Sequence, residues 1–338
     1  MKLSKLACCS LLCFAGVAHA QSRVTLYGVV DEFIQVTNTG KGYTPALQSS
    51  GEWGSRIGFR GTEEIGGGNT VNFVLEDGFV PNTGAASDPN SIFSRLAWIG
   101  AAGHWGEVRV GLQNSPVFIT SGRANAFHAG TQAAGLSDFS IYTVRTANTL
   151  SYTSPHLAGF QASIYVGLGN AGGFRQPGSS VQYSLTYDNG PFAASYAAQS
   201  VWNSTSGTQD RFAIGSTSYA FGPTTVYLGY LAVDWPEKRA NYRAYSVSAE
   251  YRFSPFSTLA FGGAYLRDRT SQDNDARQIS ALYDYFLSKR TKLYAAVTFL
   301  QNRNTASHTL VGAANSGPAL AYPGADARGV QLGIVHWF

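Results

Sequence analysis

The stretch Val330-Gln331-Leu332-Gly333-Ile334-Val335-His336-Trp337-Phe338 ends the chain and decides the fold. Because side chains alternate between the two faces of a strand, its even-numbered positions share one largely apolar face. A strand that stops at the C-terminus leaves an unpaired sheet edge, which soluble proteins usually cover. A closed barrel removes that edge by pairing its last strand with its first. The segment Val24-Thr25-Leu26-Tyr27-Gly28-Val29-Val30-Asp31 offers such a partner. We therefore predict a barrel closed by its two ends.

The first 20 residues have the pattern of a cleaved export signal. Lys2 and Lys5 precede a short apolar run, and Ala18-His19-Ala20 is a small-x-small cleavage site. The apolar run is shorter than the roughly 20 residues that a membrane-spanning helix needs. We expect residues 1–20 to be removed and one barrel domain to occupy residues 21–338. A lipoprotein signal is the alternative, but bulky residues surround its candidate cysteines.

The composition points to a membrane protein without transmembrane helices. All three cysteines, Cys8, Cys9 and Cys13, lie in the signal, which excludes a thiol enzyme or a thiolate metal site in the mature chain. Without Lys2 and Lys5, 22 basic residues face 20 acids, a balance too mild for a nucleic-acid binder. Charged residues make up only 13% of the chain, against about 25% in ordinary globular proteins. An apolar exterior built on strands is typical of a membrane barrel. We expect no cofactor and no metal.

Sixteen strand-like segments follow one another along the chain, mostly with the length of a tilted membrane strand. Short turns follow the even-numbered segments, and long polar connections follow the odd-numbered ones, with 37–51 as the first long loop and 114–145 as the third. Short turns at one rim and long loops at the other are typical of an outer-membrane barrel. The fold class is therefore an all-β, sixteen-stranded antiparallel transmembrane barrel. The expected strands are 24–36, 52–64, 69–77, 92–101, 106–113, 146–153, 159–167, 179–188, 191–199, 210–220, 224–234, 242–253, 257–268, 276–286, 291–301 and 328–338.

Alternation within the second segment orients the wall. Ile57 and Phe59 share one face, and Arg56 and Arg60 share the other. Because a basic side chain on the lipid face costs about 2–4 kcal/mol at mid-bilayer, the arginine face must look into the lumen. Sixteen strands leave a lumen too wide for side chains to fill, so it holds water. Aromatic residues near strand ends suit interfacial girdles, the candidates being Tyr27, Trp98, Tyr187, Tyr219, Tyr251, Tyr283, Tyr285, Trp337 and Phe338.

At this point the chain resembles the Gram-negative general diffusion porins, especially the β-proteobacterial type. The resemblance covers essentially the whole mature chain, and its specific part is the first 155 residues and the last strand. It rests on the first strand at 24–31 and on Ser55-Arg56-Ile57-Gly58-Phe59-Arg60-Gly61-Thr62-Glu63-Glu64, Arg95-Leu96-Ala97-Trp98-Ile99-Gly100, Gly106-Glu107-Val108-Arg109-Val110-Gly111-Leu112-Gln113, Arg145-Thr146-Ala147-Asn148-Thr149-Leu150-Ser151-Tyr152-Thr153-Ser154-Pro155 and the His336-Trp337-Phe338 end.

The resemblance implies a homotrimer of barrels, each narrowed by a third long loop that folds inward. It also implies a basic cluster on the wall opposite that loop, which carries the acid Asp138. Arg56, Arg60 and Arg145 match cluster positions, whereas Leu112 stands where many members have arginine. The expected pore constriction is completed by Arg95 and Arg109, which can restore the charge missing at Leu112.

The resemblance implies passive diffusion of ions and small hydrophilic solutes through the outer membrane. Charges close to the path set ionic preference. Several wall arginines against one loop acid predict a weak preference for anions, which the acids Glu32, Glu107, Glu250 and Asp284 would reverse if they crowd the same level. Expected partners are outer-membrane lipid, lipopolysaccharide and the barrel-insertion machinery, for which Phe338 and His336 form the assembly signal. No nucleic acid is expected.

Other functions stay open at this stage. A channel for one substrate class, such as organic acids or phosphate, would need a lysine-rich or aromatic slide, and the mature chain has only four lysines. A secreted β-rich binding protein is a third possibility. An enzyme is disfavoured because no G-x-S-x-G or H-E-x-x-H motif is present. Residues 167–172 match the letters of a dinucleotide fingerprint, but no helix can follow them.

Overall fold

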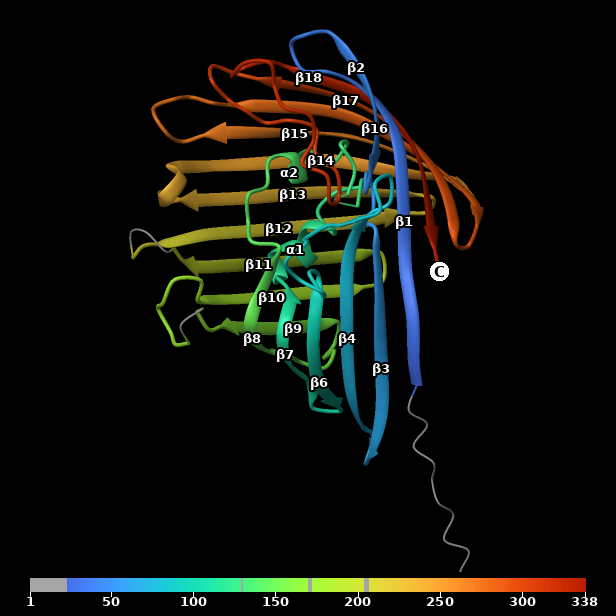
Figure 1. Ribbon diagram of the computed structural model, residues 1–338, viewed down its shortest axis with the longest axis vertical. Helices are drawn as coiled ribbons and strands as arrows, with labels where there is room; N and C mark the ends of the chain where they lie inside the picture. The colour runs from blue at the N-terminus through green and yellow to red at the C-terminus, as the bar shows by residue number, and fades with distance from the viewer. Residues whose placement is uncertain (1–22, 129, 170–171, 204–206) are drawn as a thin grey trace, which may run out of the picture.

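The computed structural model describes residues 23–128, 130–169, 172–203 and 207–338 (Figure 1). The expected signal at 1–20 lies outside these residues. Within them, no helix has the length and apolar character required to cross a membrane.

The described chain forms one antiparallel sheet that closes on itself. The two-residue strand β5 adds no position to the wall, because β4 also pairs directly with β6. Strands β2 and β3 pair with successive parts of β1, so together they occupy one position. The wall therefore has sixteen strands, which confirms the predicted fold class. The strands are β1 (Arg23–Asn38), β2 (Tyr43–Ser49), β3 (Arg56–Gly66), β4 (Asn69–Val80), β5 (Ala85–Ala86), β6 (Leu96–Gly103), β7 (Gly106–Asn114), β8 (Arg145–Thr153), β9 (Phe160–Gly167), β10 (Ser180–Asn189), β11 (Phe192–Trp202), β12 (Gln209–Phe221), β13 (Thr224–Trp235), β14 (Ala240–Ser254), β15 (Ser257–Asp268), β16 (Ala276–Ser288), β17 (Thr291–Asn302) and β18 (Ala327–Trp337).

The first and last strands close the barrel, as the sequence predicts. β18 pairs with β1 in a register that sets Trp337 opposite Val29 and Val330 opposite Val36. The backbone of Phe338 exchanges two hydrogen bonds of 3.1 Å with Gly28. A Cβ atom on Gly28 would lie 2.2 Å from the Phe338 ring, so the missing side chain makes room for the terminal aromatic residue.

Beside β1 the wall contains β2 and β3 in place of the single predicted strand 52–64. The expected loop 37–51 contains β2, and residues 50–55 leave the sheet between β2 and β3. Backbone groups that leave a sheet need other partners. Here the Asp31 carboxylate accepts the N–H groups of Glu52 and Trp53 at 2.7 and 2.6 Å. We call residues 50–55 the inward turn. Alternation along the sequence gave no signal for it, because its stabilising partner lies on another strand.

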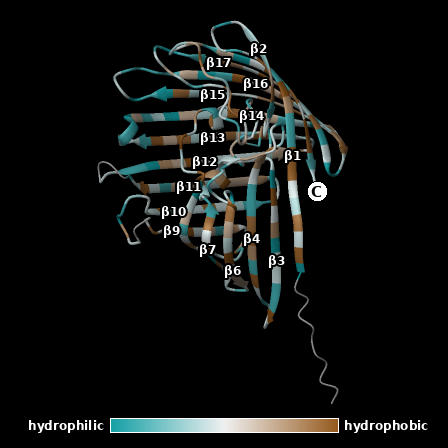
Figure 2. Cartoon of the chain, viewed as in Figure 1, coloured by the Kyte–Doolittle hydropathy of each residue, from teal (hydrophilic) through white to brown (hydrophobic). Residues whose placement is uncertain are grey.

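The two faces of the wall differ in polarity, as the hydropathy colouring of Figure 2 illustrates by its alternation along the strands. Outward positions carry exposed apolar residues such as Leu228, Val247 and Leu332. Inward positions carry buried polar residues such as Gln182 and Gln331. Three girdle candidates are wrong: Tyr27 bonds to a lumenal acid, Trp98 is buried on the face opposite exposed Ile99, and Trp337 packs against Trp53 of the inward turn.

Two long connections pack against the inner face of the wall. The third loop (residues 115–144) contains α1 (Pro116–Ser121) and α2 (Gly135–Asp138), which contact β10–β12 and β13–β16 respectively. Both helices lie within the ring of strands in Figure 1. The last loop (residues 303–326) places Leu310 in the same apolar cluster as Leu136 and Phe139 of the third loop. A short 3₁₀ helix, η1 (Pro236–Lys238), joins β13 to β14.

Candidate pore constriction

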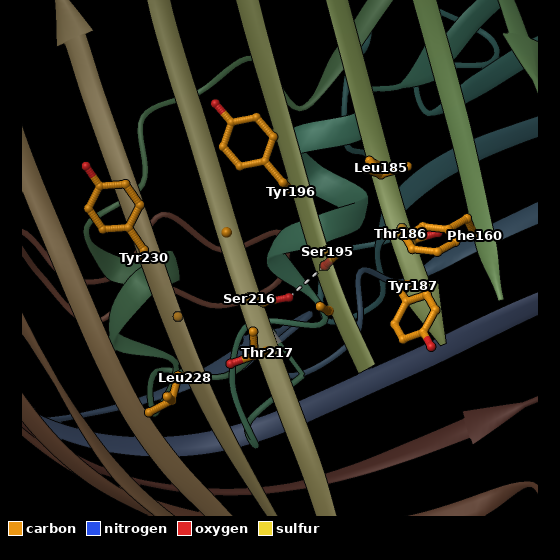
Figure 3. Close-up of a pocket in the computed structure, with 13 residues that line it drawn as sticks. Phe160, Leu185, Thr186, Tyr187, Ser195, Tyr196, Ser216, Thr217, Leu228 and Tyr230 are labelled. Carbon is orange, nitrogen blue, oxygen red and sulfur yellow. Dashed lines mark hydrogen bonds between the residues drawn. The ribbon is translucent and has the colours of Figure 1, made fainter. Parts of the chain in front are cut away.

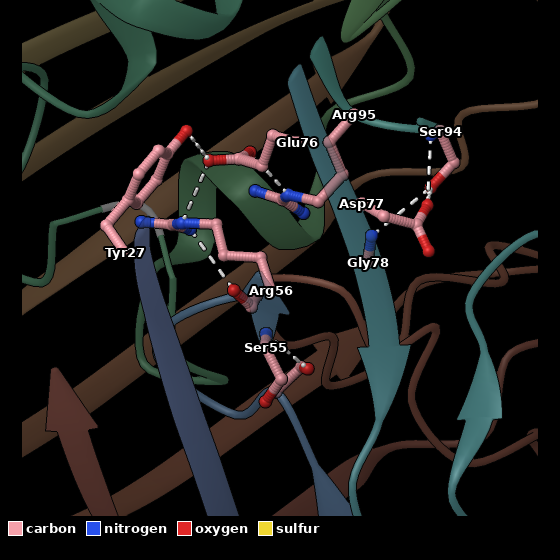
Figure 4. Close-up of polar contacts among 10 residues, drawn as sticks. Tyr27, Ser55, Arg56, Glu76, Asp77, Gly78, Ser94 and Arg95 are labelled. Carbon is pink, nitrogen blue, oxygen red and sulfur yellow. Dashed lines mark hydrogen bonds and ion pairs between the residues drawn. The ribbon is translucent and has the colours of Figure 1, made fainter. Parts of the chain in front are cut away.

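Glu76 on β4 organises the basic side chains of the wall (Figure 4). Its carboxylate lies 2.8 Å from Arg95 Nε and 3.4 Å from Arg56 Nε, and it accepts the Tyr27 hydroxyl at 2.9 Å. One acid therefore holds two guanidinium groups, and this cluster keeps a net positive charge. Each guanidinium is largely removed from bulk water, which strengthens its field relative to that of a surface charge.

The inward turn positions Arg56. Its guanidinium donates to the carbonyl of Gly54 at 3.1 Å and lies 5.8 Å from the centre of a Trp53 ring. Asp31, which accepts the backbone N–H groups of the inward turn, is itself held because it also accepts the Tyr294 hydroxyl at 2.8 Å. Gly54 leaves room for Arg95, because a Cβ atom at this position would lie 2.7 Å from the Arg95 guanidinium.

The basic wall faces the third loop across a cavity of about 470 Å³. Arg145, the first residue of β8, lines this cavity with Arg56 and Arg95. Within the described chain, no carboxylate lies within 4.0 Å of the Arg145 guanidinium. The loop side contributes Ile119, half exposed, together with Phe118, Gly122, Arg123 and His128. Residues of the wall and of the third loop line this cavity together, which makes it the candidate constriction.

Local sequence explains why the third loop can hold this position. Ser115 caps α1 by accepting the N–H of Phe118 at 3.1 Å, and Pro116 occupies the first turn. Farther along, the N–H of Ala126 donates to Ser248 on β14 at 2.9 Å. Phe127 is 3% exposed in a cluster that includes wall residues. Burial of Phe127 holds the middle of the loop against the wall.

Asp138, the one acid among the six predicted constriction residues, lies in the packing between two loops. It is buried at the end of α2, where it accepts the N–H of Val311 in the last loop at 2.9 Å. Burial raises the pKa of this carboxyl well above its usual range. The neighbouring His308 stacks edge-on against Phe139 at 5.1 Å, and burial lowers its pKa to about 4. Asp138 thus links the third loop to the last loop and does not line the cavity.

Arg60 and Arg109 lie together, but apart from the cavity. They line a second cavity, nearer the rim of short turns. Arg109 is paired with Glu107 at 2.6 Å. The predicted set is thus divided into Arg56, Arg95 and Arg145 at the first cavity, Arg60 and Arg109 at the second, and Asp138 in the packing between the two loops. Leu112 is in register with Ala97 on the outward face.

The acids that could oppose an anion preference are mostly paired elsewhere. Asp284 lies 3.1 Å from Lys292, which also contacts Glu52 at 2.5 Å. Glu250 lies 3.3 Å from His128 of the third loop, and this hydrogen bond raises the pKa of His128. Glu32 is in register with outward-facing Ile334. Among the described residues, Glu76 and Glu52 are the acids that line the candidate constriction cavity, and both carry basic partners.

Sequence reasoning missed Glu76, Glu52 and His128 as residues of the site. For Glu76 a signal existed, because it shares the inward face of its strand with Thr70 and Asn72. The sequence predicts Glu52 at the start of strand 52–64, but it lies in the inward turn, where Asp31 fixes its backbone. His128 lies on the third loop, which is expected to fold inward, but no sequence pattern singles it out from the other loop residues. In the described chain, no group of three or more His, Cys, Asp or Glu residues is placed to hold a metal ion.

A separate apolar groove lies on the outward face of β10–β13 (Figure 3). Small residues such as Ala194 and Gly215 form its floor, and Leu185, Tyr196 and Tyr230 flank it. Because these side chains face away from the lumen, the groove belongs to the membrane-facing surface and is no part of the passage.

A closed wall with an apolar exterior and a polar, charged interior defines a membrane channel. The sequence agrees, since a family model described as Gram-negative porin matches residues 7–305. Outer membrane porin protein 32 of Delftia acidovorans is 31% identical over 368 residues, with both chains covered in full. The anion-selective porin from Comamonas acidovorans superimposes with a TM-score of 0.76 at 26% identity, covering 94% of this chain and 100% of that chain. The trimer form of OmpT from Vibrio cholerae shares the fold at a TM-score of 0.69 and 13% identity, covering 94% and 99%.

The chain therefore belongs to the Gram-negative porin family. It is a multi-pass β-barrel of the outer membrane and a channel protein, as the sequence predicted.

Proposed function

We propose that this porin conducts ions and small hydrophilic solutes by passive diffusion, with a preference for anions and without a catalytic step. The observation that carries the proposal is the cavity that Arg56, Arg95 and Arg145 line together, where Glu76 pairs with Arg56 and Arg95 and leaves Arg145 without a carboxylate within 4.0 Å in the described chain. Anions passing this wall are attracted and cations repelled, and low-dielectric protein on both sides increases the effect. The Comamonas relative is described as anion-selective, which supports the same direction here.

The test is a reversal potential in a planar bilayer under a potassium chloride gradient. Purified wild-type protein should give a reversal potential of the sign set by chloride. The triple variant Arg56→Gln, Arg95→Gln, Arg145→Gln should shift it toward the potassium value. A wild-type reversal potential favouring potassium would contradict the proposed charge assignment.

The second candidate is a channel for one substrate class, such as organic acids or phosphate. Lysines contribute little to such a path, because Lys292 is held between Glu52 and Asp284. Block of chloride current by one solute at low concentration, but not by others of its size and charge, would favour this candidate over general diffusion.

We also propose the homotrimer that the family resemblance implies. Small residues on the wall do not carry this proposal: Gly28 is covered by Phe338, and Gly58 lies beneath Tyr27 on the lumenal side. Its support is the outward face of β1 and β4, where the acids Glu32 and Asp77 are in register with apolar Ile334 and Ile57. Acids suit contact with a protein subunit better than contact with acyl chains. Unheated gel electrophoresis of detergent-extracted protein, with and without crosslinking, should show a species of three chains.

Export and assembly complete the proposal. Residues 1–20 are removed, so mass spectrometry of the outer-membrane protein should find Gln21 at its N-terminus. The insertion machinery recognises the last strand through Phe338 and His336, and lipopolysaccharide surrounds the extracellular part of the barrel. His336 is exposed and contacts Thr291 at 2.9 Å, which leaves part of its ring accessible.

A further inference from the structure

The second cavity, of about 640 Å³, lies on the same wall as the constriction, nearer the short-turn rim. Arg60 is four positions after Arg56 on the same inward face, which places it about 13 Å farther along β3. Strand β3 ends at a short turn, and short turns mark the periplasmic rim of outer-membrane barrels. A solute that has passed Arg56 therefore reaches Arg60 next on its way to the periplasm.

The register explains why the wall is hollow at this point. Arg60 is opposite Val74, and Val74 is opposite Trp98, in one row across three strands. In the next row, Gly100 is opposite Arg109. Long side chains thus stand at both edges, and small ones lie between them. The result is a recess in the wall with guanidinium groups at both sides.

Both guanidinium groups are held by aromatic rings. The Arg60 guanidinium carbon lies 5.3 Å from the centre of the Tyr27 ring, and that of Arg109 lies 4.1 Å from the Trp98 ring. Such stacking restricts the side chains before a ligand arrives, so less entropy is lost on binding. The stacked faces leave the N–H edges of the guanidinium groups available to an acceptor.

The charge balance indicates the ligand. Glu107 neutralises Arg109 at 2.6 Å. For Arg60, Arg23 and Glu64, which also line the cavity, no ion pair within 4.0 Å is formed in the described part of the chain. Two unpaired cations and one unpaired acid leave a single positive charge. This complements one carboxylate better than a doubly charged phosphate.

We propose that this recess is a binding site for small carboxylate monoanions on the periplasmic side of the constriction. The inference rests on the proposed function only in that anions must be able to enter the lumen. Arg60 binds the carboxylate, with Arg23 near it on the neighbouring strand β1, and the Glu107–Arg109 pair on β7 provides the second edge. Bound anions occupy the path, so carboxylate conductance saturates with concentration.

The test uses potassium acetate as the probe and records conductance against concentration in planar bilayers. Wild-type conductance should saturate, and Arg60→Gln should raise the half-saturating concentration about threefold or more. The control is Arg252→Gln, which removes one positive charge near the same rim from β14, on a different wall, where Glu250 lies 4.0 Å from it. Glu64→Gln should shift half-saturation the opposite way, because it removes an acid from the recess.

Linear wild-type conductance over the whole range, or equal shifts in Arg60→Gln and Arg252→Gln, would overturn the binding site. A shift of Glu64→Gln in the same direction as Arg60→Gln would do so as well. None of these outcomes touches the chloride preference, which depends on Arg56, Arg95 and Arg145 and is measured separately by the reversal potential. The failure of this inference is therefore distinguishable from failure of the proposed function.

Discussion

Arg145→Gln is the cleanest perturbation of the proposed constriction, because it removes a charge without leaving an acid unpaired. Arg56 and Arg95 both contact Glu76, so losing either changes the other's surroundings. Arg145 lines the same cavity without such a contact in the described chain. Glutamine keeps hydrogen-bonding capacity and much of the length, so the substitution changes mainly the charge.

The magnitude follows from Coulomb's law. A unit charge about 8 Å from a permeating ion contributes about 0.5 kcal/mol in water and about 2 kcal/mol at an effective dielectric constant near 20. Anions and cations shift in opposite directions, so the ratio of their permeabilities changes by twice this energy. Even the aqueous value gives about 1 kcal/mol, or roughly a fivefold fall in the anion-to-cation permeability ratio.

Reversal potentials at two salt levels provide the assay. At 0.1 M salt the screening length is about 10 Å, so the fivefold effect should be present; at 1 M it is about 3 Å, and the effect should largely disappear. Glu76→Gln should change the ratio in the opposite direction. Arg328→Gln, on the outward face opposite Phe299, is the control and should change nothing. An unchanged ratio for Arg145→Gln at 0.1 M would refute the reasoning.

Three further predictions follow from the same contacts. The hydrogen bond to Glu250 raises the pKa of His128 above its ordinary value of 6.5. The imidazole therefore carries a positive charge in the cavity at pH 6.5 and below, and it loses this charge as the pH rises through the folded-state pKa. Anion preference should decline between pH 6.5 and pH 9, and His128→Asn should flatten this profile. Deleting residues 125–138 removes the contacts of the third loop with the wall and should raise single-channel conductance, whereas a deletion of 270–273 between β15 and β16 should not; unchanged conductance in the first deletion would contradict a constricting loop. Asp31→Ala removes three hydrogen bonds to the inward turn and Tyr294 and should destabilise the barrel by about 3 kcal/mol or more in urea unfolding, and a loss under about 0.5 kcal/mol would count against the turn's role.

The sequence predicted the wall well because period-two alternation and turn chemistry are local signals. The inward face of Arg56 and Arg60 follows from apolar Ile57 and Phe59 on the opposite face and from the cost of charge in lipid. Closure of the barrel follows from the second edge of the last strand, which pairs with β1 while the first edge pairs with β17. These inferences need no knowledge of which residues meet across the lumen.

The parts that could not be predicted depend on contacts between distant segments. The inward turn exists because Asp31, on another strand, satisfies its backbone. Asp138 is an acid on the expected loop, but the last loop covers it and supplies its hydrogen-bond donor. Tyr27 and Trp98 look like interfacial aromatics in the sequence, yet one binds Glu76 and both stack against arginines.

The most direct test of the account is charge placed chemically at the constriction. The cysteines of the chain all lie within residues 1–20, so Arg145→Cys should offer one reactive thiol after export. Single-channel recording before and after a negatively charged methanethiosulfonate reagent should show a lower chloride preference and a lower conductance, and a positively charged reagent should restore the preference. No change with either reagent, on protein whose labelling is verified by mass, would contradict a constriction lined by this arginine.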